Sequence, residues 1–218
     1  MKKEKKRFYV SAGFLLAFLL WTIAVCFVDV QAIGPRISSV GLAEINRFVH
    51  DLTGVHLTLY ALTDWLSLIP VAVCLLFAAI GVKQLIERKN LLKVDFSILI
   101  LGIFYLVVIA AYVFFEAFPV NYRPVLLDGC LEASYPSSTT MLVICVMMTA
   151  LMQIDVRIKN KLLKRSIDVV ILTFITFMVI GRLVSGVHWF SDIVGGVLLS
   201  IGLVMMYDWI IKKGQTRK

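Results

Sequence analysis

Six long apolar stretches constrain this chain more than any other feature. They cover Phe8–Val28, Leu57–Val82, Phe96–Phe115, Ser138–Ile154, Ile167–Ile180 and Ile193–Ile211. A helix needs about 20 apolar residues to cross a bilayer, and it satisfies its own backbone polar groups there. Only 17% of the 218 residues are charged, whereas soluble domains carry about 25%. The sequence therefore predicts an all-α integral membrane protein, a six-transmembrane-helix bundle forming one domain over residues 1–218.

The first stretch is longer than the apolar region of a secretory signal peptide, which has about 7–15 residues, so we expect a retained span. The loop that follows, 29–56, carries apolar residues at helical spacing. They are Leu42, Ile45, Val49 and Leu52. We expect a short amphipathic helix there, lying on the membrane surface.

The basic residues are divided unevenly between the two ends of the predicted helices. Of the 22 Lys and Arg, all but four lie near the two termini and in the two loops after the second and fourth stretches. The exceptions are Arg36, Arg47, Arg123 and Arg182. Lys and Arg remain preferentially on the cytoplasmic side, which predicts cytoplasmic termini and three outward-facing loops in the plasma membrane. The net charge of +8 indicates attraction to anionic membrane lipids rather than to nucleic acid.

A group of ionisable residues lies between the fifth and sixth stretches, where such residues are costly unless they have a function. If a helix begins near Val187, His188 and Asp192 stand at positions i and i+4 on one face. The carboxylate can then keep one imidazole nitrogen protonated and leave the other free to attack. Arg182 can offer its planar guanidinium to a phosphate. This pattern favours phosphoryl transfer at a membrane surface.

A second polar segment lies between the third and fourth stretches. It opens with Arg123 and closes with the run Tyr135–Thr140. Ser137 is a suitable helix cap after a proline, and free amides at a helix start together with hydroxyl groups can bind an anion. The predicted phosphate-binding residues are Arg123, Ser137, Ser138, Thr139 and Arg182.

These segments resemble the three motifs of the type 2 phosphatidic-acid phosphatase superfamily. The motif residues are Arg123-Pro124, Pro136-Ser137 and the triplet Arg182, His188 and Asp192. Integral-membrane members of that family have six helices and dephosphorylate lipid phosphates at the outer face. The resemblance covers roughly 116–192.

The resemblance assigns roles to these residues. It implies that His188 is a nucleophile forming a phospho-histidine and that Asp192 orients it. It further implies that Arg123 and Arg182 hold the phosphate and that Ser137 donates to a phosphate oxygen. No metal ion or cofactor is expected, and no pair among the four cysteines has metal-ligand spacing.

The chain departs from the family pattern at three positions. The family's first motif would place a lysine where Glu116 stands, and its second motif would place a general-acid histidine where Thr139 stands. Gly181 replaces the serine that usually precedes the third-motif arginine. The attacking half of the predicted site is therefore intact, while the half that serves the leaving group is altered.

Two interpretations follow from the missing histidine. General acid catalysis is worth about 10²–10⁴-fold, and a lipid alkoxide needs it more than a phosphate leaving group does, so a lipid pyrophosphate such as undecaprenyl pyrophosphate is favoured. Alternatively, another outward-facing residue replaces the acid. The candidates are His50, His56, Asp128 and Glu132.

Two functions other than hydrolysis remain open from the sequence. A lipid phosphotransferase would pass the phosphoryl group to an acceptor other than water. A catalytically weak pseudo-enzyme would bind a lipid phosphate without turning it over. The partners expected in every case are membrane lipids and a lipid phosphate substrate.

Overall fold

The computed structural model describes residues 2–215 and is all-helical in that range, apart from loops with three isolated β-bridges. Residue 1 and residues 216–218, which include the basic Arg217 and Lys218, lie outside the described residues. The α-helices are α1 (Lys2–Phe27), α2 (Ala43–Thr53), α3 (Leu57–Leu66), α4 (Leu68–Arg88), α5 (Phe96–Ala117), α6 (Ser138–Arg157), α7 (Lys161–Val184) and α8 (Phe190–Gln215). Two 3₁₀ turns, Pro35–Ile37 and Leu91–Lys93, lie in loops.

Six helical segments are long and apolar enough to cross a membrane, which confirms the predicted number of spans. The second span, Leu57–Arg88, consists of α3 and α4, which meet at Ser67. Pro70 lies in the first turn of α4, where its missing N–H costs no helical hydrogen bond.

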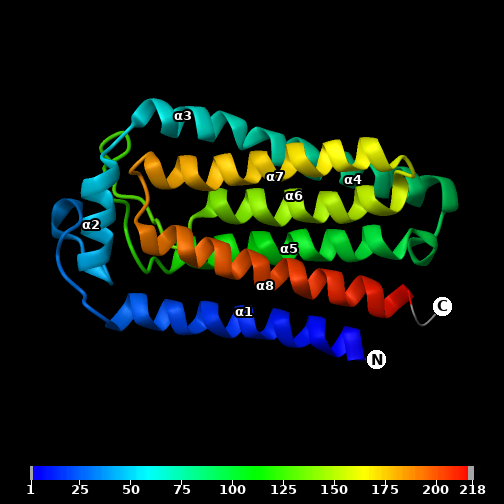
Figure 1. The fold of residues 1–218 in the computed structure, drawn as a ribbon, viewed down its shortest axis with the longest axis horizontal. Coiled ribbons are helices and arrows are strands. Elements are labelled where there is room, and N and C mark those ends of the chain that lie inside the picture. The colour runs from blue at the N-terminus through cyan, green and yellow to red at the C-terminus, as the bar shows by residue number, and fades with distance from the viewer. Residues whose placement is uncertain (1, 216–218) are drawn as a thin grey trace.

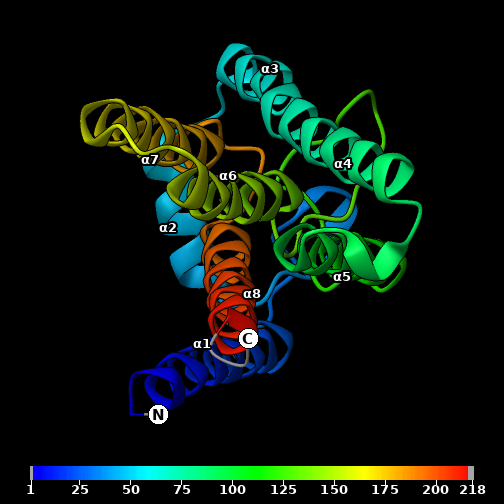
Figure 2. The same cartoon turned by 90° about the vertical axis from the view of Figure 1, so that its right-hand side faces the viewer.

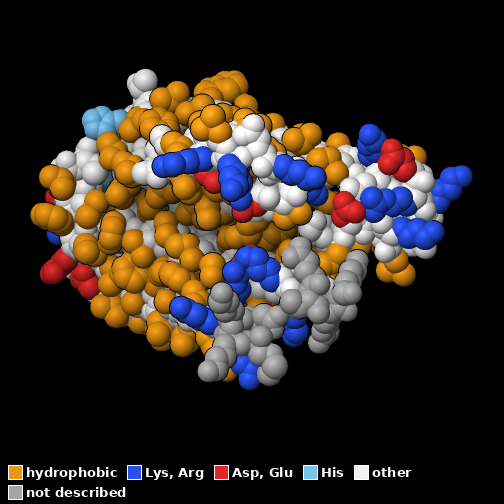
Figure 3. Space-filling view, turned by 45° about the vertical axis from the view of Figure 1, so that its right-hand side comes forward, with side chains coloured by type: hydrophobic (Ala, Val, Ile, Leu, Met, Phe, Trp, Pro, Cys, Tyr) orange, Lys and Arg blue, Asp and Glu red, His pale blue; other side chains and the backbone are white. Residues whose placement is uncertain are grey.

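The spans run side by side, and α2 crosses one end of the bundle while both described chain ends lie at the other (Figure 1). Seen along the bundle, α8 lies between α1 and α6, and α6 has α4, α5 and α7 around it (Figure 2). The α6 segment is the most buried of the six spans. One face shows apolar side chains across the bundle and Lys and Arg side chains toward the end with the chain termini (Figure 3).

The amphipathic helix expected after the first span is α2. Its exposed apolar residues Ile45, Phe48 and Leu52 lie at helical spacing, while Asn46 on the other side is fully buried. The Asn46 amide donates to Ser191 Oγ over 2.9 Å and accepts from the Ser191 backbone N–H over 2.9 Å. These bonds fasten α2 to the first turn of α8.

The turn between α7 and α8 depends on a glycine. Gly186 has φ +68°, and a Cβ on it would lie 2.0 Å from the carbonyl oxygen of Gly54. Next to it, the backbone N–H of His56 donates to the carbonyl of Ser185 over 2.9 Å. The start of α3 therefore packs directly against the segment that leads into α8.

Candidate active site

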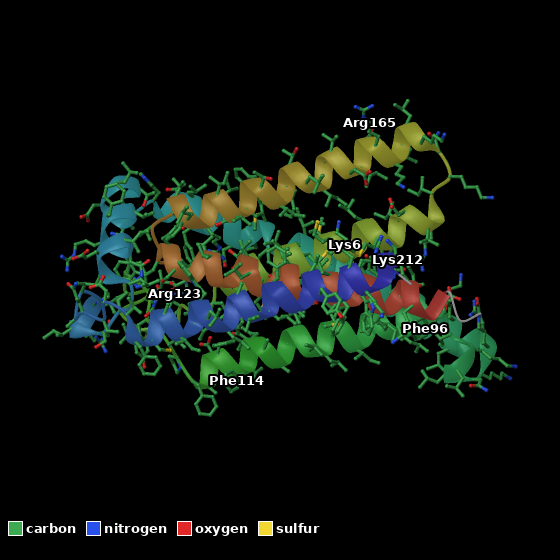
Figure 4. The ribbon with its side chains drawn as sticks, turned by 60° about the horizontal axis from the view of Figure 1, so that its bottom comes forward. Lys6, Phe96, Phe114, Arg123, Arg165 and Lys212 are labelled. Carbon is green, nitrogen blue, oxygen red and sulfur yellow. The ribbon has the colours of Figure 1, made fainter. Side chains whose placement is uncertain are left out.

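His188 lies at the end of the bundle where α2 crosses, in the segment just before α8. The sequence placed the start of this helix near Val187, but it begins at Phe190. His188 therefore precedes the helix, and only Asp192 belongs to its first turn. The side chain of His188 is 1% exposed. Figure 4 shows Arg123 at this end of the molecule, away from Lys6 and Lys212.

A serine hydroxyl lies between the His188 ring and the Asp192 carboxylate. His188 Nδ1 is 3.0 Å from Ser134 Oγ, and Ser134 Oγ donates to Asp192 Oδ2 over 2.5 Å. The direct distance from Nδ1 to Oδ2 is 3.9 Å, beyond hydrogen-bond range. The structure thus brings the predicted pair together through Ser134.

The Asp192 carboxylate is fully buried and held by further donors. The Trp189 backbone N–H donates to its Oδ2 over 2.9 Å, and the Asn121 side-chain amide donates to its Oδ1 over 3.2 Å. Buried carboxylates need such donors because burial removes their water. The carboxylate orientation is therefore fixed.

Arg123 faces the other nitrogen of the imidazole. Its Nη1 lies 3.1 Å from His188 Nε2, and its Nε lies 3.0 Å from a carboxylate oxygen of Glu132. A guanidinium only donates, so Nε2 accepts this bond and carries the lone pair. The guanidinium is therefore next to the nitrogen that carries the lone pair.

A cavity of about 100 Å³ has His188 in its wall. Its lining comes from α5, the loop after α5, the start of α6 and the segment before α8. The lining residues are Tyr112, Phe115, Glu116, Arg123, Glu132, Ala133, Ser134, Tyr135, Pro136, Ser138, Met141 and His188. Glu116, the carboxylate in the position of the family lysine, therefore faces the same space as the predicted nucleophile.

Arg182 is placed differently from Arg123. It lies inside α7, since that helix continues to Val184, and its side chain is 2% exposed. One of its terminal nitrogens donates to Asp64 over 2.8 Å and to Thr139 Oγ1 over 2.7 Å, and the guanidinium lies over the Tyr60 ring. Its Nε and Nη1 are buried and have no hydrogen-bond partner, and Arg182 does not line the cavity.

The three hydroxyl residues at the start of α6 have separate roles. Ser137 caps α6, accepting from the Thr140 backbone N–H, and is fully buried. Ser138 lines the cavity. Thr139, in the position of the family histidine, is bonded to Arg182.

Of the four candidate replacement acids, one lines the cavity and three do not. The His50 ring lies 3.2 Å from the carbonyl of Gly186, and the His56 ring lies 2.9 Å from that of Thr53; neither lines the cavity. Asp128 is exposed in a turn outside the cavity. Glu132 does line it, paired with Arg123.

Electrostatics favour a neutral imidazole. Burial, followed by the positive charges of Arg123 and Arg182, holds the pKa of His188 well below its usual value of 6.5. A neutral ring with its proton on Nδ1 offers the Nε2 lone pair as a nucleophile. No three His, Cys, Asp or Glu side chains in the described range 2–215 gather as a metal site.

Sequence reasoning did not identify Ser134, Asn121 or Asp64 as parts of this site. Ser134 stands two residues before Pro136, and only its proximity in space to His188 reveals its place. Asn121 and Asp64 come from other segments, α5's following loop and α3, and no spacing in the sequence links them to Asp192 or Arg182.

Comparisons with known proteins give a family and a similar fold. A family model described as the PAP2 superfamily matches residues 72–215. The crystal structure of a transmembrane PAP2 type phosphatidylglycerolphosphate phosphatase from Bacillus subtilis is similar in fold, with a TM-score of 0.58 and 18% sequence identity. The alignment covers 95% of this chain and 97% of that one. A search of curated proteins gave no match.

Proposed function

The chain belongs to the PAP2 superfamily, and from this membership we propose that it is a membrane phosphatase that hydrolyses a lipid phosphate or pyrophosphate through a phospho-histidine. The observation that carries the proposal is the arrangement at His188. A buried, neutral imidazole lines a cavity, and Arg123, which lines the same cavity, contacts its Nε2. A ligand-binding protein has no need of such a nucleophile.

The proposed reaction has two steps. The phosphate enters the cavity, Arg123 turns from Nε2 to the phosphate oxygens, and Nε2 attacks phosphorus while the bond to the leaving oxygen breaks. Water then attacks the phospho-histidine, a new P–O bond forms, and the N–P bond breaks to release phosphate and the neutral imidazole. Arg123 and the unpartnered nitrogens of Arg182 would stabilise charge on the transferred group.

The substrate class follows from the leaving group. Thr139 is occupied by Arg182, and the acids lining the cavity are Glu116 and the ion-paired Glu132. With no histidine to protonate a departing alkoxide, a pyrophosphate is the better substrate, because the phosphate that leaves is a weaker base. We therefore propose a substrate like undecaprenyl pyrophosphate.

The proposed topology places both termini in the cytoplasm and the cavity at the outer face of the plasma membrane, with residues 1–218 acting as one domain. The distribution of Lys and Arg supports this orientation. Cys130 offers a direct test, since it is an exposed thiol in the loop between α5 and α6. Cys26 is exposed as well, so the test starts from a Cys26→Ser protein. An impermeant maleimide added to intact cells should label this protein, and the label should be lost when Cys130→Ser is added; labelling only after lysis would reverse the orientation.

The activity is tested with purified protein and two lipids, undecaprenyl pyrophosphate and phosphatidic acid. His188→Ala is compared with His56→Ala, a histidine outside the cavity. We expect phosphate release from the pyrophosphate that is abolished in His188→Ala and retained in His56→Ala. Binding of both lipids without release by the native protein would overturn the proposal and favour the phosphotransferase or the lipid-binding pseudo-enzyme. Adding alcohol acceptors would then distinguish these two.

A further inference from the structure

We propose that Ser134 is a positioning residue that connects Asp192 to His188 and fixes which nitrogen of the imidazole attacks. This inference rests on the proposed function for its kinetic consequences, but its structural part stands on its own. Ser134 is 3% exposed, so its hydroxyl is available only to the groups packed around it.

Hydrogen-bond chemistry sets the direction of each bond. An ionised carboxylate only accepts, and a hydroxyl has a single proton to give. Ser134 Oγ must therefore donate to Asp192 Oδ2, at 2.5 Å, and accept from His188 Nδ1, at 3.0 Å. The ring proton is consequently on Nδ1, and the lone pair is on Nε2, which points to Arg123.

The serine is held in place independently of the histidine. Its backbone N–H donates to the carbonyl of Asn121 over 2.9 Å, and the Asn121 side chain donates to the same carboxylate that Ser134 contacts. The serine, the asparagine and the carboxylate thus form a fixed acceptor for the imidazole N–H. Without the hydroxyl, the Asp192 carboxylate oxygen would lie 3.9 Å from Nδ1, too far for a hydrogen bond, and the ring would keep a contact with the Ser134 backbone but lose its connection to Asp192.

The connection matters when the imidazole becomes positively charged. As the N–P bond forms at Nε2, Nδ1 keeps its proton and the ring becomes cationic. The Nδ1–H bond to Ser134 strengthens, which strengthens the serine's own bond to Asp192. No proton needs to leave the ring, so the serine transmits the effect of the negative charge without changing its own protonation.

The first test is kinetic. Ser134→Ala should lower kcat about 10–100-fold, the value of one hydrogen bond to a charged group, and change KM less than about twofold, since Ser134 acts on the ring. Ser134→Thr, which keeps a hydroxyl, should recover most of the activity. Ser11→Ala is the matched control, because Ser11 is also a fully buried serine, bonded to Gly202 in the α1–α8 contact.

A double variant separates connection from simple packing. If Ser134 acts through Asp192, Ser134→Ala in an Asp192→Asn background should cost little further kcat. Fully additive losses would overturn the proposal, as would a Ser134→Ala enzyme with native kcat.

A second measurement does not need activity. The chain has three histidines, so ¹⁵N-histidine NMR can assign His188 with the help of His50→Ala and His56→Ala. We expect the Nδ1–H tautomer in the native protein and in Ser134→Thr, and a mixed or Nε2–H signal in Ser134→Ala. An unchanged tautomer in Ser134→Ala would overturn the connection even if the protein is an active phosphatase. The expected tautomer change in a protein that releases no phosphate would instead refute only the proposed function.

Discussion

Replacing Asp192 by asparagine should remove most of the activity and leave the fold intact. The His188 Nδ1 to Asp192 Oδ2 distance is 3.9 Å. At an effective dielectric constant of about 20, a cationic imidazole and a carboxylate at that distance attract each other by about 4 kcal/mol. This attraction exists only once the ring is charged, so its loss should reduce kcat about 10³-fold.

The stability of the Asp192→Asn protein should change by no more than about 1–2 kcal/mol. An asparagine oxygen in the Oδ2 position keeps the bonds from Ser134 and Trp189, while its NH₂ group meets the amide of Asn121 and loses one hydrogen bond. Removing a buried charge offsets part of that loss.

The assay is the initial rate of phosphate release from a lipid pyrophosphate in mixed micelles, with thermal unfolding measured on the same samples. Asp128→Asn is the matched control, because Asp128 is an exposed carboxylate outside the cavity. A folded Asp192→Asn enzyme with more than a third of the native kcat would refute the reasoning, since the carboxylate would then not stabilise the charged ring.

Three further predictions follow from the site and its surroundings. The depressed pKa of His188 keeps the ring neutral at pH 6.5, so kcat/KM should stay level through that pH and fall only well below it; a profile halved near pH 6.5 would contradict this. Glu116→Lys adds positive charge to the cavity wall. At about 0.5 kcal/mol per charge pair ~8 Å apart in water, this change should lower KM for the negatively charged substrate about 3–30-fold at low salt. The effect on KM should be smaller at 0.5 M salt. Gly186→Ala should lower the melting temperature, because its Cβ would meet the carbonyl of Gly54, and an unchanged melt would mean that this turn relaxes without cost.

The sequence predicted the spans well because the requirement for apolar length acts on each segment alone. Span number and the amphipathic α2 needed no knowledge of which helices touch. The predicted helix boundaries were less accurate where polar residues lie at the ends of helices. Arg182 was assigned to a loop, yet it lies in α7, because its contacts with Asp64 and Thr139 satisfy the guanidinium inside the bundle.

Site residues were predictable from the sequence where the chemistry requires a particular residue type. They were not predictable where a residue belongs to the site only because the fold places it there. The structure brings His188 and Arg123 together as the motifs implied. The expected direct contact between His188 and Asp192 is replaced by one through Ser134. The reason is that α8 begins after the histidine, and Ser134, from another loop, lies between the two side chains. An i, i+4 pattern carries no information about a third segment.

The cavity is walled partly by Tyr112 and Phe115, which belong to the last turns of the membrane-spanning α5. From this position of the cavity, we expect the phosphate of the proposed lipid substrate to reach His188 while its hydrocarbon tail remains among its neighbours in the leaflet. For such a substrate the concentration that sets the rate is the number of substrate molecules per unit area of membrane. Diluting the substrate with inert lipid should slow turnover even when the total amount in the tube is constant, and adding more vesicles of the same composition should not change the rate per enzyme.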